Sequence, residues 1–179
     1  YPDDDVLICH NSATTGYPKG VLHFSNSLIL AAKGQLRVQF ISSRNVAMTA
    51  AWNNHHIAIS GCFTSVMAGM KVHVMSNHDA GHLLAAIARH RPNVFFAFPD
   101  VFQRMCLAGL DRHDLSSIRM WMSGGDAMHE VHIRQLVAQG AFLRLGGRKL
   151  ISSLFCELLG TSEVGMVALM KMSSQRTRR

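Results

Sequence analysis

Short apolar runs alternate with longer helix-like stretches along this sequence of 179 residues, and this alternation restricts its fold more than any other feature. The runs that have the character of buried strands lie at residues 6–9, 46–48, 71–75, 94–98, 118–122, 151–155 and 166–172. The helix-like stretches lie at residues 25–39, 56–68, 79–91 and 129–139, with one more after Pro99. Strands joined by helices of about ten or more residues are typical of parallel sheets. The sequence therefore predicts an α/β fold with a mostly parallel sheet packed by helices.

The proposed helix boundaries coincide with residues that start or stop helices. Ser25 or Asn26 can cap the first helix, and Asp79 can cap a later one. Gly69 is placed to end the helix before it, since glycine readily adopts the left-handed conformation beyond a last helical turn. Pro99 fits a first helical turn, where the missing N–H has no partner to lose.

Composition supports a folded core and argues against a membrane span. Hydrophobic residues make up 48% of the chain and charged residues 16%, which is enough apolar surface to offset the entropy lost on ordering. Residues 45–70 contain no Asp, Glu, Lys or Arg, but polar side chains interrupt them, whereas a spanning helix needs about 20 mainly apolar residues. Residues 1–5 are acidic, unlike a secretory signal. We therefore expect a cytoplasmic protein without a transmembrane segment.

A net charge of +7 favours anionic partners such as nucleotides, coenzymes, nucleic acid or phospholipid. Part of the excess lies in the basic run at residues 175–179, where no aromatic side chains interleave, so a nucleic-acid partner is disfavoured. Arg144, Arg148 and Lys149 surround two glycines and predict a solvated hairpin or loop, with contact to coenzyme phosphates as the alternative.

Cysteine and histidine spacings give no metal signature. The four cysteines are widely separated and predict reduced thiols in the core. His129 with His132, and His78 with His82, have spacings that can share one helical face, but neither pair has an apparent third ligand. We expect histidines that are solvated or satisfied within the core.

The segment at residues 11–20 has the composition of a phosphate-binding loop. It follows the first apolar run, contains hydroxyl and small side chains, and ends near Lys19. Successive backbone amides can form an anion-binding concavity, to which hydroxyls add donors and lysine adds charge. The Walker A order is absent, because Pro18 and Gly20 flank the lysine. A flexible surface loop is the alternative. Loops with Gly16, Gly125 and Gly160 all follow apolar runs and could converge on one ligand at the carboxyl edge of a sheet.

Read as a whole, residues 12–21 resemble the signature loop of the adenylate-forming superfamily, which includes acyl-CoA synthetases, peptide-synthetase adenylation domains and luciferases. Further matches follow in the order of that family and extend the resemblance over residues 4–172. They lie at His55 and His56, at residues 69–75, at 91–99, at 114–125, and at 159–163, the last being similar to a Tyr-Gly-x-Thr-Glu motif.

The resemblance implies a role for each matching position. ATP phosphates would be held by Ser12, Thr14, Thr15, Gly16 and Lys19. Adenine and AMP would be bordered by Gly124, Gly125, Asp126, Leu159, Gly160, Thr161 and Ser162. His55 and His56 would lie at the carboxylate-substrate pocket, and Glu163 would hold Mg²⁺, which prefers carboxylate and phosphate oxygens.

Four positions depart from the family pattern. Ala13 stands where glycine is usual, and Asn11 stands where Ser, Thr or Gly is usual. Leu159 replaces an aromatic residue that stacks on adenine, and Asp126 replaces an alanine. Ala13 matters most, because a methyl group would be strained if that position requires positive φ.

The resemblance also implies what the chain would be part of. Family members continue into a ribose-binding Asp, a hinge and a small C-terminal domain with a catalytic Lys, none of which matches here. We expect residues 1–172 to be part of the large N-terminal domain, residues 173–179 to be a basic tail, and the C-terminal domain to be absent.

The expected function is that of a fragment of an acyl-CoA synthetase-like ligase. Such an enzyme uses ATP, Mg²⁺ and CoA to activate a carboxylic acid, here a fatty or other hydrophobic acid on the basis of the apolar residues 55–70. We expect the isolated chain to have little or no activity. A non-enzymatic remnant of the same fold that binds nucleotide or a partner is the alternative.

Overall fold

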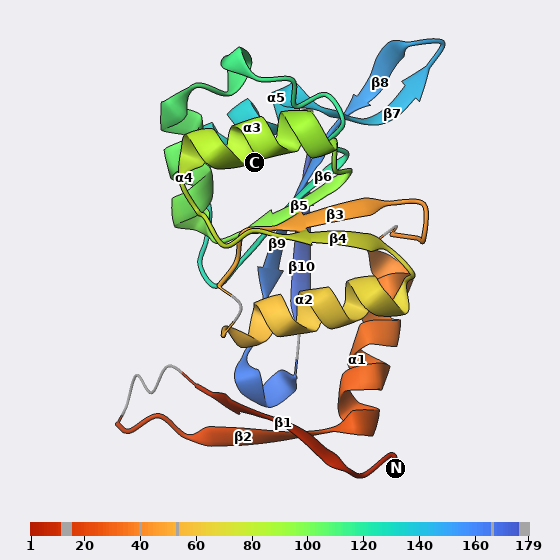
Figure 1. Cartoon of the computed structure of the whole chain (residues 1–179), viewed down its shortest axis with the longest axis vertical. Helices are drawn as coiled ribbons and strands as arrows, with labels where there is room; N and C mark the ends of the chain where they lie inside the picture. Colours follow the sequence, from red (N-terminus) through yellow and green to blue (C-terminus); the bar gives the residue numbers. More distant parts are fainter. Residues whose placement is uncertain (12–15, 40, 53, 166, 176–179) are drawn as a thin grey trace.

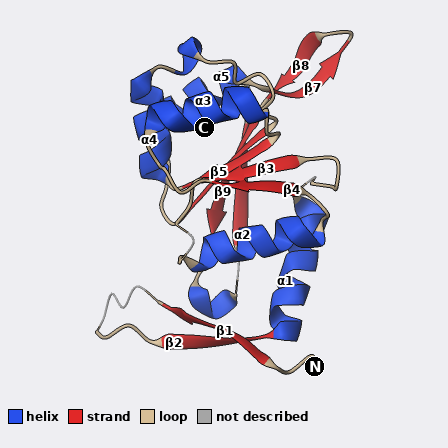
Figure 2. Ribbon diagram, viewed as in Figure 1, coloured by secondary structure: helices blue, strands red, loops and turns tan. Residues whose placement is uncertain are grey.

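A six-stranded sheet forms the centre of the computed structural model, which describes residues 1–11, 16–39, 41–52, 54–165 and 167–175 (Figures 1 and 2). The strand order is β10-β9-β6-β5-β3-β4. Four of the five neighbouring pairs are parallel, and only β10 runs antiparallel, against β9. Their bounds are β3 Val46–Thr49, β4 Lys71–Val74, β5 Val94–Ala97, β6 Met120–Gly124, β9 Leu154–Leu159 and β10 Leu169–Ser173. The predicted α/β fold with a mostly parallel sheet is confirmed.

Helices cover both faces of the sheet, as Figure 1 shows. One face packs against α3, α4 and α5, and the other packs against α2, which in turn contacts α1. The bounds are α1 Ser25–Val38, α2 His56–Met67, α3 Ala80–His90, α4 Pro99–Ala108 and α5 Glu130–Gln139, with short 3₁₀ turns η1 Leu110–Arg112 and η2 Ser162–Val164. Among the described residues, no helix combines the length and apolar character that crossing a bilayer requires.

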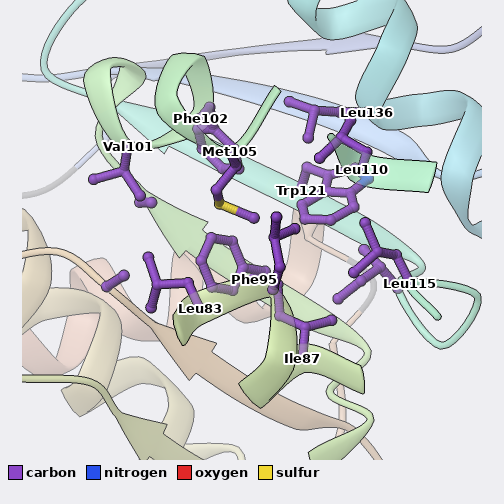
Figure 3. Packing of buried hydrophobic residues seen from close by; sticks show 14 of the residues in the cluster. Leu83, Ile87, Phe95, Val101, Phe102, Met105, Leu110, Leu115, Trp121 and Leu136 are labelled. Atoms are coloured by element: carbon purple, nitrogen blue, oxygen red, sulfur yellow. The ribbon is translucent and has the colours of Figure 1, made fainter. Parts of the chain in front are cut away.

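The larger core lies between the sheet and helices α3 to α5 (Figure 3). Phe95, Phe102, Trp121 and Phe155 are fully buried and meet edge to face, with ring centroids 5.4 to 6.1 Å apart. This arrangement contributes about 0.5–1.5 kcal/mol per pair beyond burial of area. The indole N–H of Trp121 donates to Ser153 Oγ at 3.2 Å, so the buried polar group is satisfied.

Asp79, Gly69 and Pro99 begin or end helices as predicted, but neither Ser25 nor Asn26 caps α1. The N-cap of α1 is Phe24, whose backbone N–H donates to the Ser27 hydroxyl at 3.1 Å. The Asp79 carboxylate accepts a hydrogen bond from the backbone N–H of His82 at 2.9 Å and caps α3. Gly69 directly follows Ala68, the C-cap residue of α2, and adopts a φ of +69°. Pro99 is the first residue of α4. These local signals agree with the tertiary structure.

Two antiparallel hairpins outside the central sheet correct the expected strands. Residues 6–9 belong to β1 (Asp5–His10), which pairs with β2 (Gly20–Phe24), and most of this strand is exposed rather than buried. The strand predicted over residues 151–155 is interrupted at Ser153, because β8 (Arg148–Ser152) pairs with β7 (Ala141–Leu145) before β9 begins. The hairpin expected around the basic turn is therefore confirmed.

The cysteines are free thiols, as predicted. Cys9 and Cys156 are buried, and Cys62 and Cys106 are half-buried. Burial raises the pKa of Cys106 to about 11 and that of Cys156 to about 12. These two thiols stay protonated at neutral pH and are poor nucleophiles.

Candidate functional site

The candidate site lies at the carboxyl edge of the parallel strands. Strands β3, β5, β6 and β9 run in the same direction, so the segments that follow them emerge at one edge of the sheet (Figure 1). Open α/β sheets bind ligands at this edge. The described segments concerned are residues 50–52, 54–55, Phe98, 125–127 and 160–162.

Phe98, the residue after β5, is the centre of an aromatic group at this edge. The ring of His55 meets it at 5.0 Å and the ring of Trp52 at 6.4 Å, both edge to face. Gly125 approaches the same ring at φ +93°, and a Cβ there would lie 3.3 Å from ring carbons of Phe98. A glycine is required at this position both by its backbone conformation and by the contact with Phe98.

The end of β6 packs tightly against two neighbours. A Cβ on Gly124 would lie 2.3 Å from Ile57 Cδ1 and 3.3 Å from the carbonyl oxygen of Leu158, so α2 and β9 both approach this backbone. Asp126 is exposed, and its Oδ1 accepts a hydrogen bond from the N–H of Ala127 at 2.7 Å. Gly124 is thus the buried end of β6, and Gly125 and Asp126 form an exposed bend after it.

The turn that carries Glu163 is joined to the β1–β2 hairpin. Asn11 donates from Nδ2 to Glu163 Oε1 at 2.9 Å, and Ser162 donates from Oγ to the carbonyl oxygen of His10 at 3.2 Å. Both bonds connect residues that are 152 positions apart in sequence. Asn11, the first residue of the predicted phosphate loop, therefore lies beside the predicted Mg²⁺ ligand Glu163.

Asn11 also closes the base of the predicted phosphate loop. Its Oδ1 accepts a hydrogen bond from the N–H of Lys19 at 3.0 Å, and its own N–H donates to the Lys19 carbonyl at 3.1 Å. Ser12, Ala13, Thr14 and Thr15 lie outside the described residues, whereas Gly16 and Lys19 lie within them. The role of Asn11 was missed from the sequence, where it stood out only as a departure from the family pattern.

Glu163 is an exposed carboxylate in a stabilising environment. The hydrogen bond from Asn11 holds the pKa of Glu163 below its usual range, with further help from the Glu163 backbone amide, the Thr161 hydroxyl and the positive charge of Lys19. The side chain is therefore ionised at neutral pH and carries the negative charge that a phosphate-bound cation prefers.

The segment from Leu159 to Thr161 connects β9 to that turn. Leu159 ends β9 with 64% of its surface exposed, where the family pattern has an aromatic residue. Its carbonyl oxygen accepts from the N–H of Ala168 at 2.8 Å, which fixes the backbone while the side chain faces solvent. Gly160 is exposed, and Thr161 precedes the 3₁₀ turn. An exposed apolar side chain at this edge can pack on a flat ring.

The neighbouring histidines lie in different environments. His55 is exposed, its Nδ1 accepts from the N–H of Ile57 at 3.3 Å, and partial burial lowers its pKa, so the ring beside Phe98 is neutral. His56 is buried and stacks on His23 of β2, with ring centroids 4.8 Å apart. Of the two, only His55 contacts the aromatic group at the carboxyl edge.

An apolar cavity of about 60 Å³ lies between α2 and one face of the sheet. Its walls include Ile57, Gly61 and Cys62 from α2, and Met48, Phe96 and Met122 from the strands. Ile57 and Leu158 line the cavity and also contact Gly124. The cavity is therefore adjacent to the end of β6. Sequence alone did not assign Met48, Phe96 or Gly61 to a pocket, because residues on separate elements share no spacing.

The family described as AMP-binding enzyme matches the chain over residues 1–177. A 3-aminoavenalumate diazotase from Streptomyces sp is 33% identical over 168 residues, which cover 92% of this chain and 30% of the diazotase. 4-Coumarate–CoA ligase 5 from Oryza sativa subsp. japonica is 30% identical over 136 residues, which cover 70% of this chain and 24% of the ligase. The chain thus spans less than a third of the length of these relatives.

Solved structures share the fold. The N-terminal domain of FACL13 from Mycobacterium tuberculosis superposes with a TM-score of 0.77 at 23% identity, covering 91% of this chain and 38% of that one. At this identity the similarity establishes the arrangement of helices and strands.

Proposed function

The chain belongs to the AMP-binding enzyme family, and from this premise we propose that it carries the nucleotide-binding part of an acyl-CoA synthetase-like ligase. The observation that carries the proposal is the hydrogen bond from Asn11 to Glu163, which joins the base of the phosphate loop to an ionised carboxylate. Together with the amides expected from the loop, Lys19 and the Glu163 carboxylate would suit a nucleotide whose phosphates share a cation. Residues 1–172 would be part of the large N-terminal domain and residues 173–179 a basic tail.

In the proposed site, Ser12, Thr14, Thr15, Gly16 and Lys19 bind the ATP phosphates. Gly124, Gly125 and Asp126 border the adenine, with Leu159, Gly160, Thr161 and Ser162 completing the AMP site. The exposed turn after β6 supports this assignment, because Gly125 leaves room for a flat ring near Phe98. Ser162 precedes Glu163 in sequence and donates a hydrogen bond to the carbonyl oxygen of His10, next to the predicted phosphate loop. These two features support a position of Ser162 close to a phosphate.

Glu163 would hold Mg²⁺. One exposed carboxylate fits this ion, which retains water ligands and binds through one or two carboxylates together with substrate phosphates. When bound, Mg²⁺ would neutralise charge on the departing pyrophosphate. Asn11 would keep the Glu163 carboxylate ionised and oriented toward the phosphate loop.

The acid substrate would enter beside α2. The cavity between α2 and the sheet is apolar and adjoins the end of β6, which favours a fatty or aromatic acid. Its volume of about 60 Å³ is below the roughly 300–1,000 Å³ of ligand pockets, so α2 would have to move away from the sheet to admit the acid. His55 would lie at the carboxylate end, where its neutral ring can donate or accept a hydrogen bond. The names of the two relatives, a coumarate ligase and an aminoavenalumate diazotase, also favour aromatic acids.

The proposed reaction has two steps. A carboxylate oxygen attacks the α-phosphorus of ATP, the bond to the β-phosphate breaks, and pyrophosphate leaves behind an acyl adenylate. The CoA thiolate then attacks the acyl carbon, and AMP leaves as the thioester forms. Lys19 and the loop amides would stabilise the negative charge that develops on the phosphates in the first step.

Nucleotide binding is the first test of this proposal. We expect the 179-residue chain to bind Mg·ATP in a calorimetric titration, and we expect a variant with both Lys19→Ala and Glu163→Ala to lose most of that affinity. Lys33→Ala is a matched control, because Lys33 is an exposed lysine on α1. Equal binding by wild type and double variant would overturn the proposed site.

Turnover is a separate measurement. We propose that the chain by itself supports little carboxylate-dependent exchange between ATP and pyrophosphate, since it spans under a third of its relatives. The acid panel would include cinnamic, benzoic and medium-chain fatty acids. Exchange well above that of the double variant would mean that these residues suffice for adenylation and that the inactivity proposed here is wrong. ATP binding without exchange would agree with both the ligase fragment and a nucleotide-binding remnant.

A further inference from the structure

A buried group of Cys9, His23 and His56 lies outside the candidate nucleotide site. It is the one group of three or more potential metal ligands that the described part of the chain contains, and its ligand atoms all lie within 4.8 Å of one another. The exposed fractions are 7% for Cys9, 4% for His23 and 9% for His56. Three elements contribute one residue each, namely β1, β2 and α2.

Strand register explains how two of these side chains meet. In the β1–β2 hairpin, Leu7 pairs with His23 and Cys9 pairs with Val21, so Cys9 and His23 are diagonal neighbours on the same face. That face is the buried one, because Ile8 and Leu22 on the opposite face are exposed. His56, the first residue of α2, stacks on His23 with an angle of 18° between the rings.

Two nitrogen atoms of this group lack hydrogen-bond partners in the part of the chain that the structure describes. Nε2 of His23 and Nε2 of His56 are both buried without a hydrogen-bond partner among the described residues. A buried polar atom without a partner destabilises the fold, because its bond to water is lost and not replaced. A ligand shared by both nitrogens and the nearby thiol would remove this cost. The ligand must accept electron pairs from nitrogen and sulfur at the same time, which a metal ion does.

We propose that Cys9, His23 and His56 bind one divalent zinc-type metal ion. Thiolate and imidazole together suit zinc and exclude magnesium and calcium, which prefer oxygen ligands. Bond lengths of about 2.0–2.3 Å place tetrahedral ligand atoms about 3.3–3.6 Å apart, so the group would contract by up to about 1.5 Å on binding. The Cys9 thiol loses its proton to solvent as the metal–sulfur bond forms.

The metal would link the hairpin to α2. The β1–β2 hairpin is not part of the central sheet, and the predicted phosphate loop connects its two strands. Cys9 lies two residues before Asn11, which closes the base of that loop. A metal bound at Cys9 and at α2 would therefore hold the loop base against the rest of the domain. This site does not depend on the proposed ligase activity.

Cobalt binding tests the site. The chain, purified with chelator and then freed of it, is titrated with Co²⁺ and followed by absorption. We expect one equivalent to produce the visible bands of tetrahedral cobalt and a near-ultraviolet band from thiolate to cobalt, and we expect Zn²⁺ to bleach both. Eleven histidines can bind metal loosely, but loose binding produces no thiolate band and no fixed stoichiometry.

Ligand variants identify the residues. Cys9→Ser should remove the thiolate band and weaken Co²⁺ binding by at least about tenfold. Losing a residue that only hydrogen-bonds to a metal ligand already weakens metal binding by about 10–100-fold, and losing the ligand itself should cost no less. His23→Gln and His56→Gln should each weaken it by a similar factor. Cys106→Ser and His129→Gln are controls, because Cys106 lies on α4 and His129 is an exposed residue ahead of α5. A thiolate band that persists in Cys9→Ser, or that Cys106→Ser also removes, overturns the site.

Alkylation of the wild-type chain tests whether Cys9 binds metal, and it does so even if a ligand variant fails to fold. The chain is treated with a thiol reagent with and without Zn²⁺, and each cysteine is quantified by peptide mass spectrometry. Selective slowing at Cys9, with Cys62 and Cys106 unchanged, supports the site. Equal rates at Cys9 with and without Zn²⁺ overturn it. Loss of Mg·ATP binding in the double variant described above would leave this result unaffected.

Discussion

A single side chain, Asn11, shows how one residue can organise a site. Its amide oxygen accepts from the Lys19 backbone while its amide nitrogen donates to Glu163, so both halves of the group are used. A serine or threonine at this position would be shorter and has only one hydroxyl for the two bonds. Asparagine at position 11, where the family usually has Ser, Thr or Gly, therefore bonds to Glu163 in addition to Lys19.

Replacing Asn11 should change the titration of Glu163. We expect Asn11→Ala to raise the pKa of Glu163 toward its ordinary value, because the Asn11 hydrogen bond is the largest of the interactions that lower it. The pKa of Glu163 is lower in the folded chain than in the unfolded chain. Its contribution to stability is thus present above the ordinary pKa and is lost as pH falls through the folded value.

Carboxyl-detected NMR titration measures this change directly. Asn26→Ala is the matched control, since Asn26 is an exposed asparagine at the start of α1. The interpretation fails if Glu163 titrates at the same pH in wild type and in Asn11→Ala.

Two glycines should respond in opposite directions to the same substitution. A Cβ on Gly140 would lie 1.9 Å from the carbonyl oxygen of Ile118, so Gly140→Ala should destabilise the fold by about 1–3 kcal/mol or more. Gly34, inside α1, has nothing within 4 Å of such a Cβ, so Gly34→Ala should stabilise by about 0.5–1 kcal/mol. Urea unfolding of both variants provides the comparison. A destabilised Gly34→Ala would contradict the open space around Gly34.

At the scale of elements, a helix such as α3 is specified by residues within it, whereas the β1–β2 hairpin is positioned by contacts with distant residues. Helix α3 has a capping aspartate at its start and buries Leu83, Leu84 and Ile87 along one side. The β1–β2 hairpin buries mainly Cys9 and His23, so it adds little apolar area of its own. Its position depends on the bonds from Asn11 to Glu163 and from Ser162 to His10.

The cap of α3 should be measurable. Asp79→Ala should lower the free energy of unfolding by about 0.5–2 kcal/mol, because the backbone N–H of His82 loses its acceptor at the helix start. Asp79→Asn should recover most of the loss, since an asparagine side chain also caps helices. Asp3→Ala, at an exposed aspartate near the N-terminus, should change stability by no more than about 0.5 kcal/mol. Chemical unfolding of the three variants tests the cap, and a loss in Asp3→Ala equal to that in Asp79→Ala would contradict it.

At the scale of the whole molecule, burial is unequal between the central sheet and the two hairpins. Strands β5 and β6 are buried over nearly all their length, whereas β7, β8 and much of β1 are exposed. Stability therefore should not be uniform, and opening of the hairpins should require less free energy than opening of the sheet.

Hydrogen exchange would resolve this difference. We expect amides of β5 and β6 to exchange only through global unfolding, and amides of both hairpins to exchange through local opening at lower free energy. Zn²⁺ should slow exchange in β1 and β2 without changing β7 and β8, because the proposed metal ligands lie in the first hairpin only. Uniform exchange across all strands would contradict the ranking.

The sequence by itself determined strands β3 to β6 of the central sheet and the helices that cover it. Strand β9 was predicted only in part, because the expected strand at residues 151–155 runs across the end of β8. The apolar run at residues 94–98 identified β5, and Asp79, Gly69 and Pro99 fixed helix ends. These features depend on backbone conformation and on the apolar character of residues close together in sequence, so a short stretch of sequence is enough to identify them. The loop at residues 11–20 was likewise recognisable, because its small and hydroxyl side chains are contiguous.

Only the tertiary structure decided which residues meet. The bond from Asn11 to Glu163, the group around Phe98, and the group of Cys9, His23 and His56 each join separate elements. The exposed position of β1 was also mispredicted, since an apolar run gives no indication of whether a second sheet face will cover it. Contacts of this kind depend on strand register and on helix placement over the whole fold. No local spacing encodes them, because the residues are brought together only when the sheet and its helices have packed.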